Sequence, residues 1–329
     1  MHICIVQMCR SSDGRPVPDL DQLIQASRLY YELGETQSRV AELLGVTRPQ
    51  VSRLLKRARA EGVVEIRIID RAAEVSTAGD ELRERFGLGA VHLAPALVGP
   101  EEVSRRMIGR LAGEVLRAAI RDGAVVGIGD GASISAVADA VAAEEPHHET
   151  GATVVPLCGG YWFGGPAREP FRRVADGIGG VPLGLLAPGL VDDPATKAAL
   201  CAHAGVRRIL DLWDRLEVAA FGIGGPVWSA ASLGQGTTDR LEAEGAVGEI
   251  LVRPFTLDGR FVGDELRDRT IAFDARDLPR IPVRIAVAGG PTKVRPILGA
   301  LRSGVVTTLV TDRRTAEAVL QLDVSGSAT

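Results

Sequence analysis

The residues with the clearest chemical meaning are basic side chains gathered in one short segment, residues 36–60. The segment carries six basic residues and one acidic residue, Glu42, although the whole chain has a formal net charge of −4, which leaves −9 for all other residues. A small basic segment on an acidic body is typical of a DNA-binding module joined to a second domain. The basic residues are Arg39, Arg48, Arg53, Lys56, Arg57 and Arg59.

These side chains could make two kinds of contact with a DNA duplex. Arginine can hold guanine O6 and N7, and glutamine can hold adenine N6 and N7, when a helix lies in the major groove. Contacts from Arg57, Arg59 and Arg39 to phosphates would position the protein without determining its sequence preference. The alternative is a basic helical hairpin that only faces solvent. The predicted DNA-binding residues are Thr47, Arg48, Gln50, Ser52, Arg53, Lys56 and Arg57.

Two short helices must position these residues. Thr36 can cap the first helix, and Gly45 suits the following turn because glycine tolerates a positive φ. Thr47 and Gln50 have the spacing of a capping box at the start of the second helix. Two helices joined by so short a turn fit the helix-turn-helix motif. The apolar face of the second helix is predicted to consist of Val51, Leu54, Leu55 and Ala58.

A second possible binding element is the glycine-rich segment 125–133, a predicted strand that leads through a tight turn into a helix. Free backbone N–H groups and the positive end of the helix meet there, and glycine lets a ligand approach the backbone. A phosphate or a cluster of sugar hydroxyls suits this loop better than a dinucleotide, because the spacing departs from GxGxxG. The alternative is an ordinary strand-to-helix turn.

Two further glycine-containing loops, residues 222–225 and 289–293, also follow predicted strands. In a parallel sheet all three loops lie at the carboxyl edge, where open α/β sheets bind ligands. Lys293 stands in the last loop, and it is one of only three lysines, with Lys56 and Lys197, in a chain that has 38 basic residues. A lysine retained among so many arginines favours a role for its compact ammonium group.

The larger part of the chain alternates short apolar runs with helical patterns, which predicts an α/β fold with a mostly parallel sheet. We predict a flexible tail over residues 1–18, a winged helix-turn-helix domain over 19–70, a linker over 71–78 and an α/β domain over 79–329. Within the first domain a helix is expected over 20–33 and a strand over 63–69. Further strands are predicted over 90–94, 124–128, 153–157, 181–186, 218–223, 284–288 and 307–310, and helices over 101–121, 133–143, 194–203, 291–301 and 315–322.

Composition excludes several classes of protein. With 46% hydrophobic residues in 329, the chain is not a disordered protein, and no apolar run approaches the roughly 18 residues that span a bilayer. The first nine residues lack the basic start of a signal peptide, so a cytoplasmic location is expected. No metal site or disulfide framework is predicted, because the Cys and His residues show no ligand spacing. They are Cys4, Cys9, Cys158, Cys201, His2, His92, His147, His148 and His203.

In these motifs the sequence resembles the SorC family, sugar-responsive bacterial transcriptional regulators named for the sorbitol operon. Residues 37–59 carry the resemblance most closely, and 61–68 look like that family's entry into its winged strand. The resemblance covers nearly the whole chain from about Leu20 onward. In the large domain the similar segments are residues 155–160, 186–194, 221–224, 245–249 and 287–293.

The resemblance implies a Rossmann-like effector domain similar to the glucosamine-6-phosphate isomerase/deaminase fold, which binds a phosphorylated sugar. Three departures weaken the expectation of a phosphate and add an unphosphorylated sugar or polyol as an alternative: Asp130 adds a negative charge beside the loop, Ala132 supplies no hydroxyl where the family often has Thr or Arg, and Cys158 stands where some members carry Arg. With the loop glycines, the expected effector-binding residues are Gly129, Gly131, Ala132, Ser133, Cys158, Gly224, Glu249 and Lys293.

Together these features predict a DNA-binding regulator that a sugar or sugar phosphate controls. No catalytic residue, cofactor or metal is expected, because acids and bases such as His203 and Asp258 form no familiar catalytic pattern. The expected partners are operator DNA, the sugar and a second copy of the chain, as a homodimer or homotetramer, because paired half-sites need paired helices. Two alternatives stay open: a sugar-phosphate isomerase or deaminase with an appended helical hairpin, and a DNA-binding protein whose large domain only oligomerises.

Overall fold

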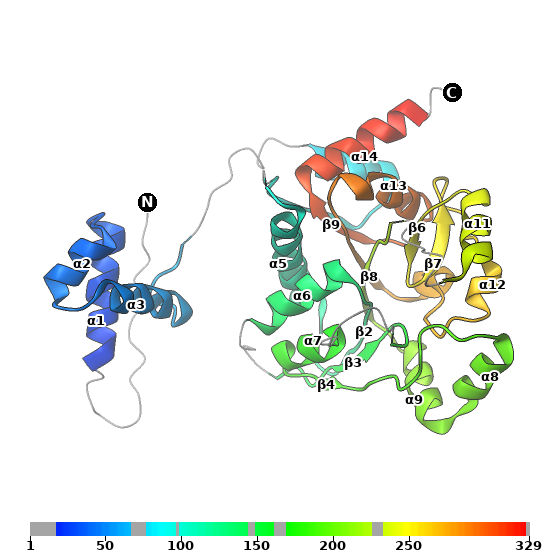
Figure 1. Cartoon of the computed structure of the whole chain (residues 1–329), viewed down its shortest axis with the longest axis horizontal. Coiled ribbons are helices and arrows are strands. Elements are labelled where there is room, and N and C mark those ends of the chain that lie inside the picture. The colour runs from blue at the N-terminus through cyan, green and yellow to red at the C-terminus, as the bar shows by residue number, and fades with distance from the viewer. Residues whose placement is uncertain are drawn as a thin grey trace. The chain divides into compact units, whose positions relative to one another are not determined.

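The computed structural model describes residues 18–66, 77–96, 99–143, 149–160, 169–225 and 233–326. The chain divides into two units, residues 1–70 and 71–329, each of which is described by itself (Figure 1). The expected tail up to residue 17 and linker residues 71–76 lie outside the described residues. The same holds for Cys4, Cys9, His2, His147 and His148.

The first unit is a small helical domain. The two helices joined by the turn at Gly45 form as the sequence predicts. Thr36 caps α2, since its hydroxyl accepts a hydrogen bond from the Arg39 N–H (3.2 Å), and Gly45 ends α2 with φ of +63°. A core of Ala26, Val40, Ala41, Val51 and Leu55 joins the helices. The elements are α1 (Pro18–Ser27), the π-helical turn η1 (Arg28–Glu32), α2 (Gln37–Leu44) and α3 (Arg48–Ala60).

Two predictions for this unit are wrong in detail. The single helix expected over 20–33 changes to a π-helical turn at Arg28, whose carbonyl accepts from the Leu33 N–H (3.1 Å). The strand expected over 63–69 is absent from 63–66, and 67–69 lie outside the described residues. The reason is that the Val64 N–H donates back to the Ala58 carbonyl (3.0 Å), so the backbone completes the end of α3 and forms no wing strand within 63–66.

The second unit contains a seven-stranded sheet in the order β1-β9-β8-β5-β2-β3-β4, and every neighbouring pair is parallel. Most residues of its strands are apolar because both faces of the sheet are covered. Alternate residues of one strand therefore enter different cores: Val218 and Ala220 face one, and Ala219 and Phe221 face the other. The strands are β1 (Ala90–Ala94), β2 (Val125–Ile128), β3 (Thr153–Pro156), β4 (Val181–Pro182), β5 (Val218–Gly222), β8 (Val283–Val287) and β9 (Thr308–Asp312).

Helices cover both faces of the sheet. One core lies beneath α5 (Glu101–Ala119), α6 (Ala132–Ala142) and α7 (Pro170–Ile178), which are seen together on one side in Figure 1. The other core includes residues of α4 (Ala78–Phe86), α9 (Ala204–Trp213), α13 (Val294–Arg302) and α14 (Arg313–Gly326). The remaining helical segments are α8 (Pro194–Ala202), α11 (Gln235–Ala243), α12 (Asp264–Arg267), η2 (Ala275–Arg280) and η3 (Pro291–Lys293).

The order of the strands creates a switch point between β2 and β5. From β2 the chain proceeds through α6 to β3 and through α7 to β4, whereas from β5 it proceeds in the opposite direction to β8 and β9. The segments that leave the carboxyl ends of β2 and β5 therefore diverge. Open α/β sheets bind ligands in the crevice at such a point.

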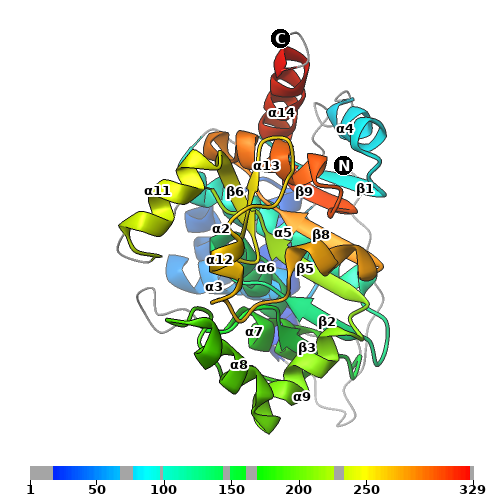
Figure 2. The same ribbon diagram turned by 90° about the vertical axis from the view of Figure 1, so that its right-hand side faces the viewer.

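A hairpin of β6 (Ala246–Ile250) and β7 (Arg253–Thr256) is attached to this edge. Gly224 and Glu249 form an antiparallel bridge that ties the hairpin to the loop after β5. Figures 1 and 2 show the hairpin and α12 on the side of the sheet opposite α5, α6 and α7. Strand β6, which carries the Glu249 carboxylate, therefore lies at the switch point.

The prediction of a mostly parallel α/β sheet is confirmed, but several elements differ from it. β4 spans two residues where a strand over 181–186 was expected, because Pro182 lacks an N–H and the strand is an edge that pairs only with β3. The helix expected over 291–301 begins as the 3₁₀ turn η3. Sequence patterns also missed α4, α7, α9, α11 and the hairpin.

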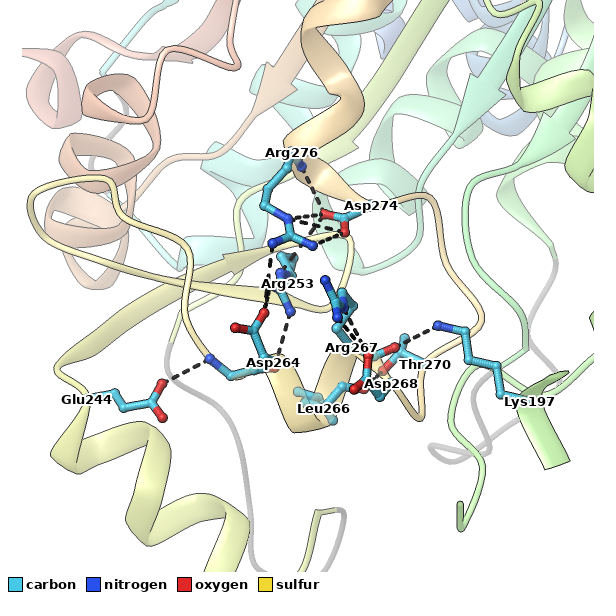
Figure 3. Close-up of polar contacts among 11 residues, drawn as sticks. Lys197, Glu244, Arg253, Asp264, Leu266, Arg267, Asp268, Thr270, Asp274 and Arg276 are labelled. Atoms are coloured by element: carbon cyan, nitrogen blue, oxygen red, sulfur yellow. Dashed lines mark hydrogen bonds and ion pairs between the residues drawn. The ribbon is translucent and has the colours of Figure 1, made fainter. Parts of the chain in front are cut away.

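The segment after the hairpin is held by a cluster of ion pairs (Figure 3). Arg253 is buried, with 3% of its surface exposed, and donates to the Gly263 carbonyl (3.1 Å) and the Asp264 carboxylate (2.6 Å). Arg276 pairs with Asp274 (2.7 Å), and Lys197 of α8 donates to the Arg267 carbonyl (2.7 Å). These contacts join β7, α8 and α12 beneath the edge of the sheet.

We expect Arg253→Ala to lower the free energy of unfolding by about 2–3 kcal/mol, because it removes charge-assisted hydrogen bonds from a buried site. The Arg253 hydrogen bond also lowers the pKa of Asp264. Its contribution is therefore present above the ordinary aspartate pKa and is lost as the pH falls through the lowered value. Urea denaturation at several pH values measures both effects.

The matched control is Arg240→Ala, whose guanidinium pairs with Glu265 (2.7 Å) while both side chains are more than half exposed. An exposed pair contributes less than about 1 kcal/mol. Equal losses in the two variants would contradict the assignment of Arg253 as the anchor of this segment.

Candidate ligand cavity and nucleic-acid interface

A cavity of about 710 Å³ lies at the carboxyl edge of the sheet, at the switch point. Its walls come from the ends of β2, β3, β5 and β8, from the start of α5 and from the β6–β7 hairpin. This volume is within the range of small-molecule sites. The lining residues with charged or polar side chains are Glu101, Arg105, Asp130, Ser133, Cys158, Glu249 and Lys293.

The cavity brings together most of the effector-binding residues that the sequence predicts. Those in its lining are Gly131, Ala132, Ser133, Cys158, Gly224, Glu249 and Lys293. Gly129 is not in the lining: a Cβ there would lie 3.3 Å from Phe221 and from Leu251. This glycine therefore serves close packing below the cavity, which is a different role from the predicted ligand contact.

Glu249 is the carboxylate on the hairpin wall. Its backbone exchanges hydrogen bonds with Gly224 (2.9 and 3.2 Å), and a Cβ at position 224 would overlap the carboxylate, so only glycine fits there. One carboxylate oxygen accepts from the Val252 N–H (2.6 Å). Burial raises the pKa of Glu249, while the Val252 hydrogen bond and nearby Lys293 oppose that rise. The other oxygen, Oε1, lies against Gly224, and the residue lines the cavity.

Lys293 supplies an ammonium group to the lining of the cavity. Burial lowers the pKa of Lys293, and the carboxylates of Glu249 and Glu101 oppose that shift. The Nζ atom would be 3.7 Å from a Cβ at Gly225, so the ammonium lies against the loop that follows β5. Lys197, the other lysine of this unit, does not line the cavity, because its ammonium holds the last turn of α12 (Figure 3).

The start of α6 forms the third polar wall. Gly131 has φ of +105°, and its N–H donates to the Asp130 carboxylate (2.7 Å). The N–H groups of Ala132 and Ser133, in the first turn of the helix, have no acceptor within it. The glycine-rich loop thus presents backbone donors to the cavity as predicted, but with a carboxylate beside them.

Sequence analysis missed two charged residues of the lining, Glu101 and Arg105, in the first turns of α5. Their spacing of four is the pattern of an ordinary solvated helix face, so nothing local marks them as ligand contacts. Along the chain, α5 connects β1 to β2, and β9, β8 and β5 lie between these two strands in the sheet. This crossover brings α5 beside the loop that follows β8.

The tip of the hairpin is strained. Leu251 and Val252 have φ of +51° and +64°, and they are the only non-glycine residues with positive φ in the described part of the chain. A two-residue hairpin turn of type I′ needs positive φ at both positions, which glycine and asparagine usually supply. Both residues line the cavity, and Leu251 is buried. Burial and the Glu249 hydrogen bond offset the strain of a conformation that is costly for a β-branched residue.

We expect Val252→Gly to leave the free energy of unfolding unchanged or to raise it by up to about 1 kcal/mol, because glycine adopts positive φ without strain. Val283→Gly, at a partly buried position of β8, should lower it by about 1 kcal/mol or more. Thermal and urea denaturation compare the two variants. If both are equally destabilised, the turn is not strained.

The predicted DNA-binding side chains lie on the open face of α3. Thr47, Gln50 and Arg53 are exposed, whereas Val51, Leu55 and Ala58 are buried. Arg57 is half-buried and pairs with Glu61 (2.5 Å). Gln50 performs its capping role, since its amide oxygen accepts from the Thr47 N–H (2.7 Å). The other predicted contacts, Arg48, Ser52 and Lys56, are exposed as well.

Within the described residues, no helix is long and apolar enough to cross a membrane. No three His, Cys, Asp or Glu side chains in that part of the chain are grouped closely enough to hold a metal ion.

Comparison with known proteins agrees with both halves of this arrangement. Residues 70–321 match the family model described as a sugar-binding domain, and residues 18–65 match a homeodomain-like domain. The erythritol catabolism regulatory protein EryD of Brucella abortus is 30% identical over 90% of this chain and 95% of its own length. The deoxyribonucleoside regulator of Bacillus subtilis is 29% identical over 90% of this chain and 96% of its own length.

The full-length sorbitol operon regulator SorC from Klebsiella pneumoniae has a similar solved structure. It covers 93% of this chain and 100% of its own, with a TM-score of 0.76 and 26% sequence identity. These relatives are regulators rather than enzymes, which favours the predicted regulator over the alternative of an isomerase or deaminase. The family model, the relatives and the shared fold together confirm the predicted resemblance: the chain belongs to the SorC family of transcriptional regulators.

Proposed function

We propose that a sugar-type effector in the cavity at the β2–β5 switch point controls how tightly α3 holds operator DNA. The observation that carries the proposal is a single chain with two separate binding surfaces. One is the exposed, basic face of α3, and the other is a cavity whose carboxylates and ammonium group can exchange hydrogen bonds with hydroxyls.

The residues assigned to the two surfaces follow from their positions. Arg48, Gln50 and Arg53 occupy the first half of α3 and would contact base edges, while Arg57 would contact phosphate. In the cavity Glu249 would accept hydrogen bonds from hydroxyls, and Lys293 would donate them. The names of relatives mention deoxyribonucleosides, sorbitol and erythritol, all of which carry several hydroxyl groups.

The proposal includes a symmetric oligomer of this chain, a dimer or tetramer. A helix that contacts one half-site gains affinity when a second helix contacts another half-site one helical turn, or a multiple, away. Light scattering with and without operator measures the oligomeric state. The effector would then act by favouring one arrangement of subunits over another.

The test is a titration of a labelled operator, found by footprinting the promoter regions next to the gene, with and without candidate sugars. Binding of sugar and of DNA are coupled reciprocally if the cavity controls α3. The factor by which a sugar changes operator affinity must therefore equal the factor by which operator changes sugar affinity. Calorimetry on the free and DNA-bound protein measures the second factor. Unchanged operator affinity with every metabolite of the neighbouring genes would contradict the proposal.

A further inference from the structure

The charges of the cavity bear on whether its ligand carries a phosphate. The lining includes three carboxylates, Glu101, Asp130 and Glu249, and two cationic groups, Arg105 and Lys293. A site for a phosphate dianion needs an excess of cations or of free N–H donors. This lining has an excess of acid instead.

The backbone donors at the start of α6 already face a carboxylate. The Asp130 side chain lies at the positive end of the helix and accepts the Gly131 N–H (2.7 Å), where an anion would otherwise bind. Asp130 is exposed to the cavity, so its charge also acts on anything that approaches the Ala132 and Ser133 N–H groups. A phosphate dianion at this position would be repelled over a short distance.

The two cationic groups are compensated as well. Lys293 lies close enough to Glu249 and Glu101 for both carboxylates to favour its charged form. Arg105 lies 3.8 Å from the Glu102 carboxylate, its neighbour on α5. Each cationic group therefore already has a carboxylate neighbour before a ligand binds.

We propose that the cavity takes a neutral polyhydroxylated ligand, a free sugar or sugar alcohol, and discriminates against its phosphate ester through Asp130. Asp130 and Glu249 accept hydrogen bonds from hydroxyls, and Arg105 and Lys293 donate to them. This inference rests on the proposed function, because it specifies the chemical class of the effector for the same cavity.

The experiment uses matched pairs on the full-length protein: erythritol, ribose, fructose and sorbitol, each beside its phosphate monoester. Release of labelled operator and thermal stabilisation of the protein are measured for every pair. The neutral member of at least one pair should release operator at a concentration at least about tenfold below that of its ester. Inorganic phosphate should stabilise the protein no more than chloride at equal ionic strength.

Asp130→Asn provides the decisive variant, because its amide oxygen can still accept the Gly131 N–H while the charge is lost. The preference for the neutral member should fall by about tenfold or more, and inorganic phosphate should now stabilise the variant. Asp176→Asn, which removes an exposed carboxylate of α7 outside the cavity, is the matched control and should change neither.

Two results would overturn the inference: an ester that binds the wild type more tightly than its neutral partner, or an unchanged preference in Asp130→Asn. Either would leave the proposed function intact, since a sugar phosphate would still control DNA binding. If no member of either series releases operator, the proposed function itself fails, and this inference fails with it.

Discussion

Arg53→Ala should weaken binding to the specific operator by about 1–3 kcal/mol and leave binding to random DNA almost unchanged. Arg53 is exposed on the first half of α3, and within the described residues its guanidinium makes one long hydrogen bond, to the Pro49 carbonyl (3.4 Å). The guanidinium is therefore available to a base edge. Alanine favours helix, so the variant should keep α3 intact.

Fluorescence anisotropy with specific and random duplexes at several salt concentrations measures this effect. Arg57→Ala is the comparison, since Arg57 lies farther along α3 and pairs with Glu61. It should weaken both complexes alike and reduce the salt dependence by about one counterion. If Arg53→Ala behaves in the same way, Arg53 contacts phosphate rather than a base.

Lys293→Met should reduce the effect of a sugar on operator binding by roughly 10- to 100-fold in sugar concentration, because a charge-assisted hydrogen bond contributes about 1.5–3 kcal/mol. Operator affinity without sugar should stay within about twofold, since Lys293 is not on the DNA-binding unit. The measurement is the sugar concentration that releases half of the operator.

The same variant should change the response of stability to pH. Burial raises the pKa of Glu249, and Lys293 opposes that rise, so its removal lets the pKa rise further. A group with a raised folded pKa favours folding below its unfolded pKa, and that advantage is lost as the pH rises through the folded value. Lys293→Met should therefore lose more stability than the wild type between acidic and neutral pH.

Lys197→Met is the matched control, because it removes the other half-buried lysine of this unit, whose ammonium holds the Arg267 carbonyl outside the cavity lining. It should lower stability and leave the sugar response in place. A normal sugar response in Lys293→Met would show that the ammonium group does not contact the effector.

The helical unit was predictable because its signals are local. Caps, turns and apolar spacing within 25 residues decide that Thr36 and Thr47 begin helices and that Gly45 ends one. Exposure of Gln50 and Arg53 follows from the same spacing, since Val51 and Leu55 must face the core. The wing strand was not decided locally, because a strand needs a partner, and the backbone after Gly62 bonds back to α3 within the described residues.

The cavity could be predicted only in part from local sequence signals. The sequence by itself indicated the glycine loops, Lys293 and the parallel sheet that gathers them at one edge, because β–loop–α order forces strand ends together. Glu249 was expected only from the resemblance to the family, since the hairpin that carries it was not predicted. Only the tertiary structure decided that Gly129 packs below the cavity and that Glu101 and Arg105 join its wall. It also decided that Lys197 binds a helix end and that a strained turn supports Glu249. These outcomes depend on contacts between residues far apart in the chain, which no spacing within one element encodes.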